Sequence, residues 1–393
     1  MTSHLIPSYA PPDLVFERGE GVWLYDAHGE KWLDFIAGIA VDALGHCHPA
    51  LVTALEEQAQ KLWHVSNMFK VPMREQLAAR YCAATFADLV FFTNSGTEAI
   101  EGALKAARKY HADNGEEDRI EVVTFAGAFH GRSYGAINAG GNPAYLKGFG
   151  PRLPGFTQIP FADDDAAKAA ITGKTAAVLI EPVQGEGGLR AAPDAFLRLL
   201  RQLCDETGAL LIYDEIQCGA GRTGKLFAYQ WSGARPDIMA VAKGVGGGFP
   251  LGAWLTTQAV GEHMVVGTHG STYGGNPLAM AVGIALWDEI TKPGFLDHVT
   301  QMGQFLKQQM AGLADSYPDV IADVRGKGLL TGFKLHEPYN NRALMAQARE
   351  RGLLIGAAGD NVVRMAPPLI ITEDHGRHAI KVLDETLASV QAG

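Results

Sequence analysis

Short apolar runs alternate with stretches of helical periodicity between about Glu75 and Leu278. Runs of four or five apolar residues are typical of buried strands. Their alternation with helices predicts β-α-β units and a mainly parallel sheet covered on both faces. In such sheets ligands bind beyond the carboxyl ends of the strands. The predicted strands are Leu89–Phe92, Ile120–Thr124, Ala177–Ile180, Leu210–Tyr213 and Ile238–Val241.

The pattern changes after Pro277. Leu278–Ile290 has helical periodicity, and a second long helical pattern and a short β region at Leu329–Leu335 follow it. We therefore expect an α/β protein whose large domain has a mainly parallel sheet, beside a smaller α+β domain. The predicted boundaries are 1–45 for an N-terminal segment packing with the small domain, 46–275 for the large domain and 276–393 for the small domain.

Composition agrees with a folded, two-domain chain. The 393 residues are 47% hydrophobic and 19% charged, and single cores seldom grow past roughly 250–300 residues. Glycine is in excess, at 47 residues, or about 12% against a usual value of about 7%. This excess indicates many tight turns and close backbone approaches, which often hold phosphates.

Charge and targeting signals narrow the function classes. The formal net charge is −10 and no basic cluster stands out, which argues against a nucleic-acid partner. The chain begins without a signal-peptide pattern and has no apolar window of roughly 20 residues, so we expect no membrane span and a cytoplasmic location. The cysteines are dispersed without a C-x-x-C motif, which predicts free, buried or half-buried thiols. They are Cys47, Cys82, Cys204 and Cys218.

The first polar segment at a strand end is Thr93–Glu98. Ser95 and Glu98 have the spacing of a capping box, which predicts a helix start with free backbone N–H groups. Those groups and the hydroxyls of Ser95 and Thr97 would form a phosphate cradle. This spacing alone is more often an ordinary helix cap.

The second segment, Asp214–Gln217, follows the strand Leu210–Tyr213. Strand alternation would send the Asp214 and Glu215 side chains to opposite sides, and a buried carboxylate needs a partner. A pyridinium nitrogen would keep such a carboxylate ionised. A metal-binding pair and a helix cap are the alternatives.

The third segment places Lys243 between an apolar strand and a glycine-rich turn. Burial would lower the pKa of its amine, which suits Schiff-base chemistry. A phosphate loop of the G-x-x-x-x-G-K-[ST] type is excluded because there the lysine follows the glycines. An ordinary surface lysine is the alternative.

In this order the three segments resemble the fold-type-I pyridoxal-phosphate enzymes, and more closely the class III aminotransferases. The resemblance covers nearly the whole chain. Its motifs are Gly38–Val41 with Gly45–Pro49, Asn94–Ala99, Phe129–Arg132, Glu181–Gly188, Asp214–Gln217, Ala242–Gly244 and Ser271–Pro277.

The resemblance implies pyridoxal 5′-phosphate as cofactor. Lys243 would carry it as a Schiff base and shuttle a proton, and Asp214 would keep the ring nitrogen protonated. Further cofactor contacts are expected from Ser95, Gly96, Thr97, Phe129, Glu215, Ile216, Gln217 and Thr272. In this family Ser271 and Thr272 approach from the second subunit, so the resemblance also implies a homodimer with shared active sites.

Substrate contacts are also implied. Arg364 would bind the α-carboxylate of glutamate and Arg132 the carboxylate of an acetylated donor, because guanidinium pairs bidentately with carboxylate. Glu186 would pair with an arginine in one half-reaction and release it in the other. Ser271 is also expected to contact the substrate. The resemblance favours N2-acetylornithine as amino donor and 2-oxoglutarate as acceptor. The alternatives are N-succinyl-diaminopimelate, succinylornithine, ornithine or 4-aminobutyrate as donor, or an aminomutase of the same fold.

Two residues near the N-terminus could suggest a metal. His46 and His48 are spaced i, i+2 without a carboxylate beside them in the sequence, which favours a loop packed near the cofactor and no metal. Asp42 stands where the family often has asparagine, which adds a carboxylate to a loop expected to face the substrate.

Overall fold

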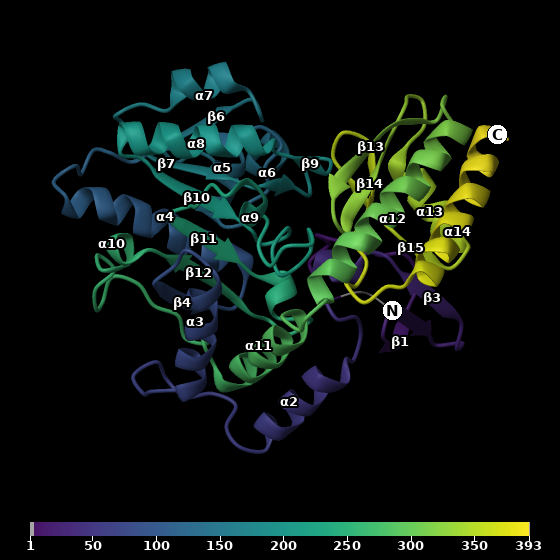
Figure 1. Cartoon of the computed structure of the whole chain (residues 1–393), viewed down its shortest axis with the longest axis horizontal. Helices are drawn as coiled ribbons and strands as arrows, with labels where there is room; N and C mark the ends of the chain where they lie inside the picture. Colours follow the sequence, from purple (N-terminus) through teal and green to yellow (C-terminus); the bar gives the residue numbers. More distant parts are fainter. Residues whose placement is uncertain (1–3, 393) are drawn as a thin grey trace.

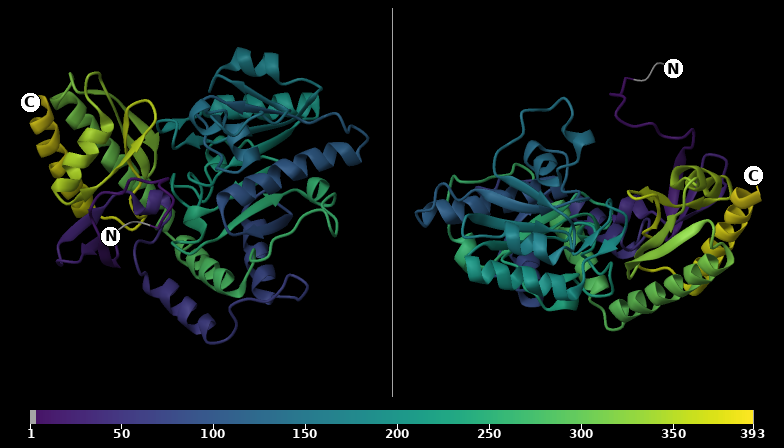
Figure 2. Two further views of the ribbon diagram at one scale, coloured as in Figure 1. Left: turned by 180° about the vertical axis from the view of Figure 1, so that it is seen from behind. Right: turned by 90° about the horizontal axis from the view of Figure 1, so that it is seen from above.

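The computed structural model describes residues 4–392 and arranges them in two lobes that lie side by side in Figures 1 and 2. The large lobe is built on a seven-stranded sheet of order β4-β12-β11-β10-β7-β5-β6. Only β12 runs antiparallel to its neighbours. The strands are β4 (Leu89–Thr93), β5 (Glu121–Phe125), β6 (Phe156–Ile159), β7 (Thr175–Ile180), β10 (Leu210–Asp214), β11 (Ile238–Val241) and β12 (Gly252–Thr256).

All five strands predicted from the sequence are present, four with ends shifted by one or two residues and β11 with the predicted ends. Helix α4 (Gly96–Asp113) covers one face of the sheet and α8 (Asp194–Thr207) the other. Strand alternation divides the core accordingly. Leu179 and Ile212 pack with the α4 side, whereas Tyr213 packs in the cluster that includes α8.

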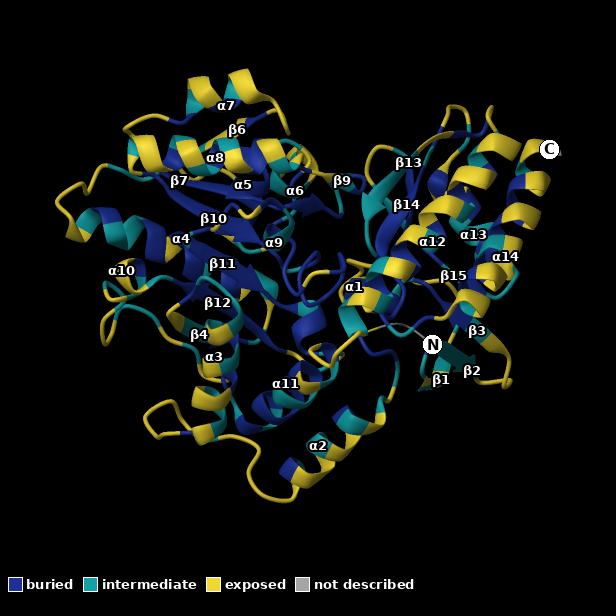
Figure 3. Cartoon of the chain, in the orientation of Figure 1, coloured by how far each residue is buried: buried dark blue, intermediate teal, exposed yellow. Residues whose placement is uncertain are grey.

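The small lobe has an antiparallel sheet of order β13-β14-β17-β16. Its strands are β13 (Ile321–Lys327), β14 (Leu330–Leu335), β16 (Gly356–Ala358) and β17 (Val362–Met365), and its helices are α12 (Phe295–Ser316), α13 (Asn341–Glu350) and α14 (Glu373–Ala392). Figure 3 shows these helices exposed on their outer faces and buried toward the sheet. The fold class predicted from the sequence, α/β with a large parallel-rich sheet, is confirmed.

The N-terminal segment adds a third sheet. Strands β1 (Phe16–Glu20), β2 (Trp23–Asp26) and β3 (Lys31–Asp34) pair in order, and β3 also pairs with β15 (Leu353–Leu354) near the C-terminus. The first and last parts of the chain therefore share one sheet. The boundaries at residues 45 and 275 stay a prediction.

The remaining elements connect these sheets. Helix α11 (Pro277–Ile290), predicted as Leu278–Ile290, packs on α2 (Pro49–Ala59) and α3 (Pro72–Ala84). The shorter elements are α1 (Ala37–Ala40), α5 (Tyr134–Gly140), α6 (Pro143–Leu146), α7 (Asp164–Ala170), β8 (Val183–Gln184), β9 (Arg190–Ala191), α9 (Tyr229–Ser232), the 3₁₀ turn Lys243–Val245 and α10 (Gln258–Gly261).

Two further predictions concern the whole chain. No helix within residues 4–392 is long and apolar enough to cross a membrane. The four cysteines are free, as predicted, but Cys47 is exposed rather than buried or half-buried.

Candidate active site

A cavity of about 350 Å³ lies at the carboxyl ends of β4, β10 and β11. It brings together nine of the residues singled out in the sequence: Ser95, Gly96, Thr97, Phe129, Glu186, Asp214, Ile216, Gln217 and Lys243. Glu215, Arg132, Ser271, Thr272 and Arg364 are not among the residues that line it.

The N-terminus of α4 opens into this cavity. Ser95 Oγ accepts a hydrogen bond from Glu98 N at 3.3 Å, while the Glu98 carboxylate accepts from Asn94 N at 2.6 Å. The capping box is thus present, but the Glu98 carboxylate accepts from the N–H of Asn94 instead of the N–H of the cap residue Ser95. A Cβ on Gly96 would lie 2.8 Å from the Ile216 side chain, so only glycine lets the helix start approach so closely. The free amides and the helix dipole suit a phosphate.

Asp214 lies on the wall of the cavity with both oxygens engaged. Its Oδ1 accepts from Ile216 N at 3.0 Å, and its Oδ2 lies 2.8 Å from His130 Nδ1. Both side chains are buried. His130 Nε2 has no partner within residues 4–392. In the sequence, His130 stands out only as part of the motif Phe129–Arg132 and has no role of its own. Its pairing spans 84 positions, so no local sequence pattern could have indicated it.

Glu181 is a cavity residue to which the sequence motif assigned no role. It follows β7, is buried, and accepts a hydrogen bond from Phe129 N at 3.1 Å. Burial, and then the charge of Asp214, raises the pKa of this carboxyl well above its usual value. Its position at the end of a buried strand, like that of Asp214, is the signal that could have identified it.

Glu215 is not among the residues that line the cavity, so its assignment as a cofactor contact stays a prediction. Its carboxylate accepts from the backbone N–H groups of Ala228 at 2.6 Å and Tyr229 at 2.7 Å. The reason is the alternation that separates it from Asp214. Burial raises its pKa to about 7 against the opposing backbone hydrogen bonds. Glu215 therefore anchors α9 to the sheet.

Lys243 begins the 3₁₀ turn with a left-handed φ of 51°, a conformation that costs a non-glycine residue of order 1–3 kcal/mol. Its side chain is partly buried and reaches the cavity, and it makes no hydrogen bond or ion pair within the described residues. Burial lowers the pKa of its amine, Glu186 raises it, and the net direction is downward. The amine is thus poised as a nucleophile and base.

Arg364 on β17 is buried behind the cavity and forms an ion pair with Glu186, with 2.5 Å between Nη1 and Oε1. The same nitrogen lies 3.5 Å from Gln217 Oε1. Arg364 Nε has no partner in the described part of the chain. The pair therefore connects the small sheet to the edge of the cavity.

Arg132 is exposed and lies in a neighbouring cavity of about 710 Å³ that Glu186 and Lys243 also line. Its guanidinium stands 3.8 Å from the centre of the Tyr145 ring and 5.5 Å from that of Phe129. It makes no ion pair within residues 4–392. The two predicted carboxylate-binding arginines therefore differ sharply in environment.

Ser271 and Thr272 lie apart from the cavity of their own chain. Ser271 accepts from Asn94 Nδ2 at 3.4 Å, and its carbonyl accepts from Asn67 Nδ2 at 2.6 Å. Thr272 is exposed. That Ser271 and Thr272 contribute to the active site of a second subunit stays a prediction.

The loop with His46 differs from expectation, because carboxylates do stand beside it in space. His46 Nε2 lies 2.8 Å from Asp34 Oδ2, and Asp42 completes a cluster close enough to surround a cation. Asp34 Oδ1 already accepts from Ile36 N and Ala37 N. The cluster thus anchors the start of α1, where Ala37, Gly38, Ile39 and Ala40 all have positive φ.

The cavity combines a buried aspartate, a helix start suited to a phosphate and a lysine whose side chain has no partner among the described residues. At the carboxyl ends of a mainly parallel sheet, these groups define a fold-type-I pyridoxal-phosphate-dependent enzyme. Residues 6–387 match the family described as aminotransferase class-III, and the chain belongs to this family. The aminotransferase activity predicted from the sequence is confirmed at this level.

Relatives match over the full length. The chain is 56% identical to acetylornithine aminotransferase 2 of Caulobacter vibrioides, over 99% of this chain and 96% of that one. The N-acetylornithine aminotransferase of Stenotrophomonas maltophilia is 37% identical, with a TM-score of 0.85 and 97% of each chain covered. An ornithine aminotransferase of Toxoplasma gondii, described with partial occupancy of PLP, is 31% identical, with a TM-score of 0.94, covering 99% of this chain and 93% of that one.

The residues present fit pyridoxal 5′-phosphate. The helix start at Gly96 and Thr97 suits its phosphate, Phe129 and Ile216 offer apolar surface to its ring, and Asp214 offers a carboxylate to its nitrogen. Lys243 is the free amine that the cofactor's aldehyde requires.

Proposed function

We propose that this aminotransferase transfers the terminal amino group of N2-acetyl-L-ornithine to 2-oxoglutarate, giving N-acetyl-L-glutamate 5-semialdehyde and L-glutamate in arginine biosynthesis. The observation that carries this proposal is Arg132, an unpaired guanidinium within residues 4–392, in the cavity that Lys243 also lines. A donor whose carboxylate lies far from the reacting amine would place the carboxylate on Arg132 and the amine at Lys243.

The residues around Lys243 divide the chemistry. Pyridoxal phosphate, when bound, supplies the electron sink for the carbanion. Asp214, fixed by His130 and Ile216 N, holds the proton at the ring nitrogen. Lys243 moves the proton at the carbon that carries the transferred amino group, and its lowered pKa favours the neutral amine.

Glu186 and Arg364 serve the two alternating substrates. With the acetylated donor, Glu186 stays paired with Arg364, so the buried guanidinium keeps a counter-charge. With glutamate or 2-oxoglutarate, the substrate's α-carboxylate replaces Glu186 on Arg364. The side chain of Glu186 is 31% exposed, so it can move away from Arg364 into solvent.

We also propose a cytoplasmic homodimer with shared active sites. Large apolar side chains are exposed in two neighbouring segments, Leu62–Phe69 and Val265–Tyr273, with Val266 fully exposed. An exposed apolar surface of this kind supports self-association. A second subunit there would also explain why Ser271 and Thr272 do not line the cavity of their own chain.

Initial rates of glutamate formation from 2-oxoglutarate test the donor. N2-acetylornithine is expected to give a higher kcat/KM than each of four other donors, namely N-succinyl-diaminopimelate, succinylornithine, ornithine and 4-aminobutyrate. A clear preference for ornithine over its acetylated form would refute the assignment. Turnover of a single amine without 2-oxoglutarate would instead indicate an aminomutase.

A further inference from the structure

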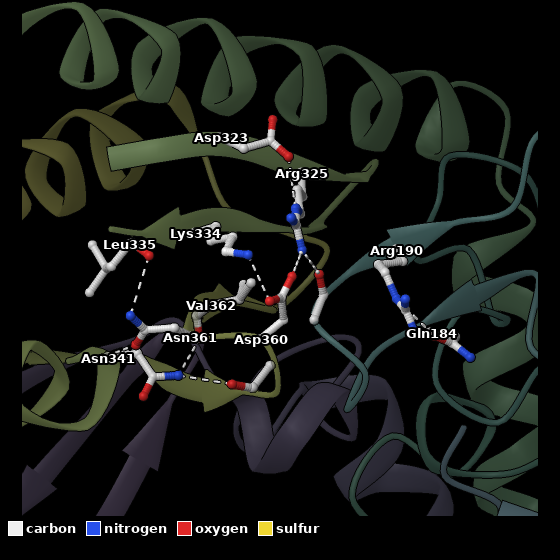
Figure 4. Close-up of polar contacts among 12 residues, drawn as sticks. Gln184, Arg190, Asp323, Arg325, Lys334, Leu335, Asn341, Asp360, Asn361 and Val362 are labelled. Atoms are coloured by element: carbon white, nitrogen blue, oxygen red, sulfur yellow. Dashed lines mark hydrogen bonds and ion pairs between the residues drawn. The ribbon is translucent and has the colours of Figure 1, made fainter. Parts of the chain in front are cut away.

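The turn between β16 and β17, residues 359–361, is held by a charged clamp outside the active site. The Asp360 carboxylate pairs with Arg325 and Lys334 (Figure 4), at 2.6 Å from Arg325 Nη1 and 2.7 Å from Lys334 Nζ. Arg325 also pairs with Asp323 at 2.7 Å. Burial opposes ionisation of Asp360, but the hydrogen bonds from Lys334 and Arg325 prevail and lower its pKa. The clamp is therefore charged at neutral pH.

The same turn touches the loop that carries Glu186. Gly359 N donates a hydrogen bond to Glu186 O at 2.8 Å, and Arg325 Nη1 lies 3.5 Å from Gly188 O. A Cβ on Gly188 would stand 2.8 Å from Gly359 O and 3.2 Å from Asp360 Cβ. Loop and turn thus pack backbone to backbone without room for a side chain.

The turn also sets the position of Arg364, which follows Asp360 by four residues on β17. One short segment therefore fixes the backbone of Glu186 and the strand of its ion-pair partner. Two asparagines hold this segment independently of the clamp. Asn361 Nδ2 donates to Leu335 O and Tyr339 O, and Asn341 Nδ2 donates to Ala358 O and Val362 O.

We propose that Asp360 is a positioning residue for the exchange of Glu186 on and off Arg364. Its clamp keeps the Glu186 backbone in place, so that only the carboxylate moves between the two half-reactions. This inference rests on the proposed function for the roles of Glu186 and Arg364. The amino donor needs the state in which Glu186 is paired with Arg364, whereas glutamate and 2-oxoglutarate need the state in which Glu186 has left Arg364. Loss of the clamp destabilises the paired state more than the released state.

The variant Asp360→Asn tests this, because asparagine has the same shape and tolerates the left-handed φ of 55° at this position. We expect KM for the amino donor to rise about three- to tenfold, with kcat within about twofold and no rise in KM for 2-oxoglutarate. Asp323→Asn is the matched control, since it also removes a partner of Arg325 but not a contact to the turn. It is expected to behave like the wild type.

A double-mutant cycle with Glu186→Gln distinguishes positioning from a general structural defect. If Asp360 acts through Glu186, Asp360→Asn has no further effect on donor KM in the Glu186→Gln background. An equal fold-change in both backgrounds, or an Asp323→Asn variant as impaired as Asp360→Asn, overturns the inference.

Titration of the holoenzyme with glutamate alone, followed by the cofactor's absorbance, gives a readout that does not depend on the donor. We expect Asp360→Asn to reach half-conversion at an equal or lower glutamate concentration than the wild type, and a several-fold higher one contradicts the proposal. Failure of the donor assignment would appear separately, as wild-type enzyme inactive on N2-acetylornithine.

Discussion

The cofactor end and the substrate end of the site are built differently. At the cofactor end, Asp214, His130 and Glu181 are buried, and each has a fixed partner from the large lobe. At the substrate end, Arg132 is exposed and makes no ion pair within residues 4–392, and Glu186, which is partly exposed, is proposed to leave Arg364. The cofactor stays in place through the cycle, whereas two different substrates must alternate. Fixed partners suit the first task and exchangeable partners the second.

The two ends also differ in what a lost group costs. Removing a partner from a buried charge leaves that charge uncompensated, at roughly 3–5 kcal/mol. The exposed Arg132 rests mainly on Tyr145 and Phe129, an arrangement worth about 0.5–1 kcal/mol at exposed sites. Substitutions at the cofactor end should therefore affect every substrate, and those at the substrate end only one half-reaction.

The largest effect is expected for Lys243→Ala. It removes both the amine that holds the cofactor and the base that moves the proton, so kcat should fall by about 10⁴-fold or more with every donor. Glutamate formation from 2-oxoglutarate measures this. Lys292→Ala is a control, because that lysine is exposed and, within the described part of the chain, its side chain pairs only with Glu289. A Lys243→Ala enzyme that forms glutamate at the wild-type rate would refute the catalytic assignment.

Asp214→Asn should come next. The neutral amide cannot hold the proton at the ring nitrogen, and kcat should fall about 10²- to 10³-fold for both half-reactions. The neighbouring Glu215→Gln is the control that separates the two adjacent carboxylates. It leaves one of the N–H groups of Ala228 and Tyr229 without an acceptor, which should lower the free energy of unfolding by about 1–3 kcal/mol with little change in kcat. Equal losses of activity in both variants would contradict the division.

Arg132→Gln should affect the donor alone. Loss of a charge-assisted hydrogen bond costs about 1.5–3 kcal/mol, so kcat/KM for the acetylated donor should fall about 10- to 100-fold. KM for 2-oxoglutarate should stay within about twofold, because its α-carboxylate is proposed to bind Arg364. Steady-state kinetics with each substrate varied decide this. A parallel loss for 2-oxoglutarate would mean that Arg132 binds the α-carboxylate of 2-oxoglutarate as well as the carboxylate of the acetylated donor.

The same contrast explains what the sequence could predict. Ser95, Asp214 and Lys243 were found because each follows an apolar strand, and parallel strands bring their carboxyl ends to one edge of the sheet. The sequence missed the partners that depend on distant segments. His130 meets Asp214 across 84 positions, and Asp34 meets His46 through the pairing of the N-terminal sheet. No local period or motif encodes such contacts.

The assignment of Glu215 as a cofactor contact shows the same limit of local sequence patterns. Strand alternation had already separated it from Asp214, but membership in a shared motif grouped the two as cofactor contacts. The backbone N–H groups of Ala228 and Tyr229, at the start of α9, donate hydrogen bonds to the Glu215 carboxylate and follow Glu215 by 13 and 14 residues in the sequence. The position of these N–H groups depends on the path of the chain after Cys218, and the apolar pattern of the sequence does not specify that path.

The substrate end contains one fixed element, the left-handed turn Ala37–Ala40, which places Ile39 in the cavity of Arg132. A non-glycine residue in this conformation costs roughly 1–2 kcal/mol, and Asp34 offsets this cost by accepting from Ile36 N and Ala37 N. His46 in turn holds Asp34. The hydrogen bond to Asp34, with the charges of Asp34 and Asp42, raises the pKa of His46 against the opposing effect of burial.

The smallest effect is therefore expected for His46→Gln, and it should depend on pH. A histidine whose folded-state pKa is raised stabilises the fold fully below its unfolded pKa of about 6.5 and loses that contribution as pH rises through the folded value. Because the His46 side chain keeps contact with solvent, although Asp34 is buried, screening limits the effect to about 0.5–1 kcal/mol. Thermal unfolding should show a larger deficit in Tm at about pH 6 than at about pH 9. An equal deficit at both pH values would mean that His46 holds the turn only as a neutral hydrogen-bond partner, and that the substrate end has no charged anchor there.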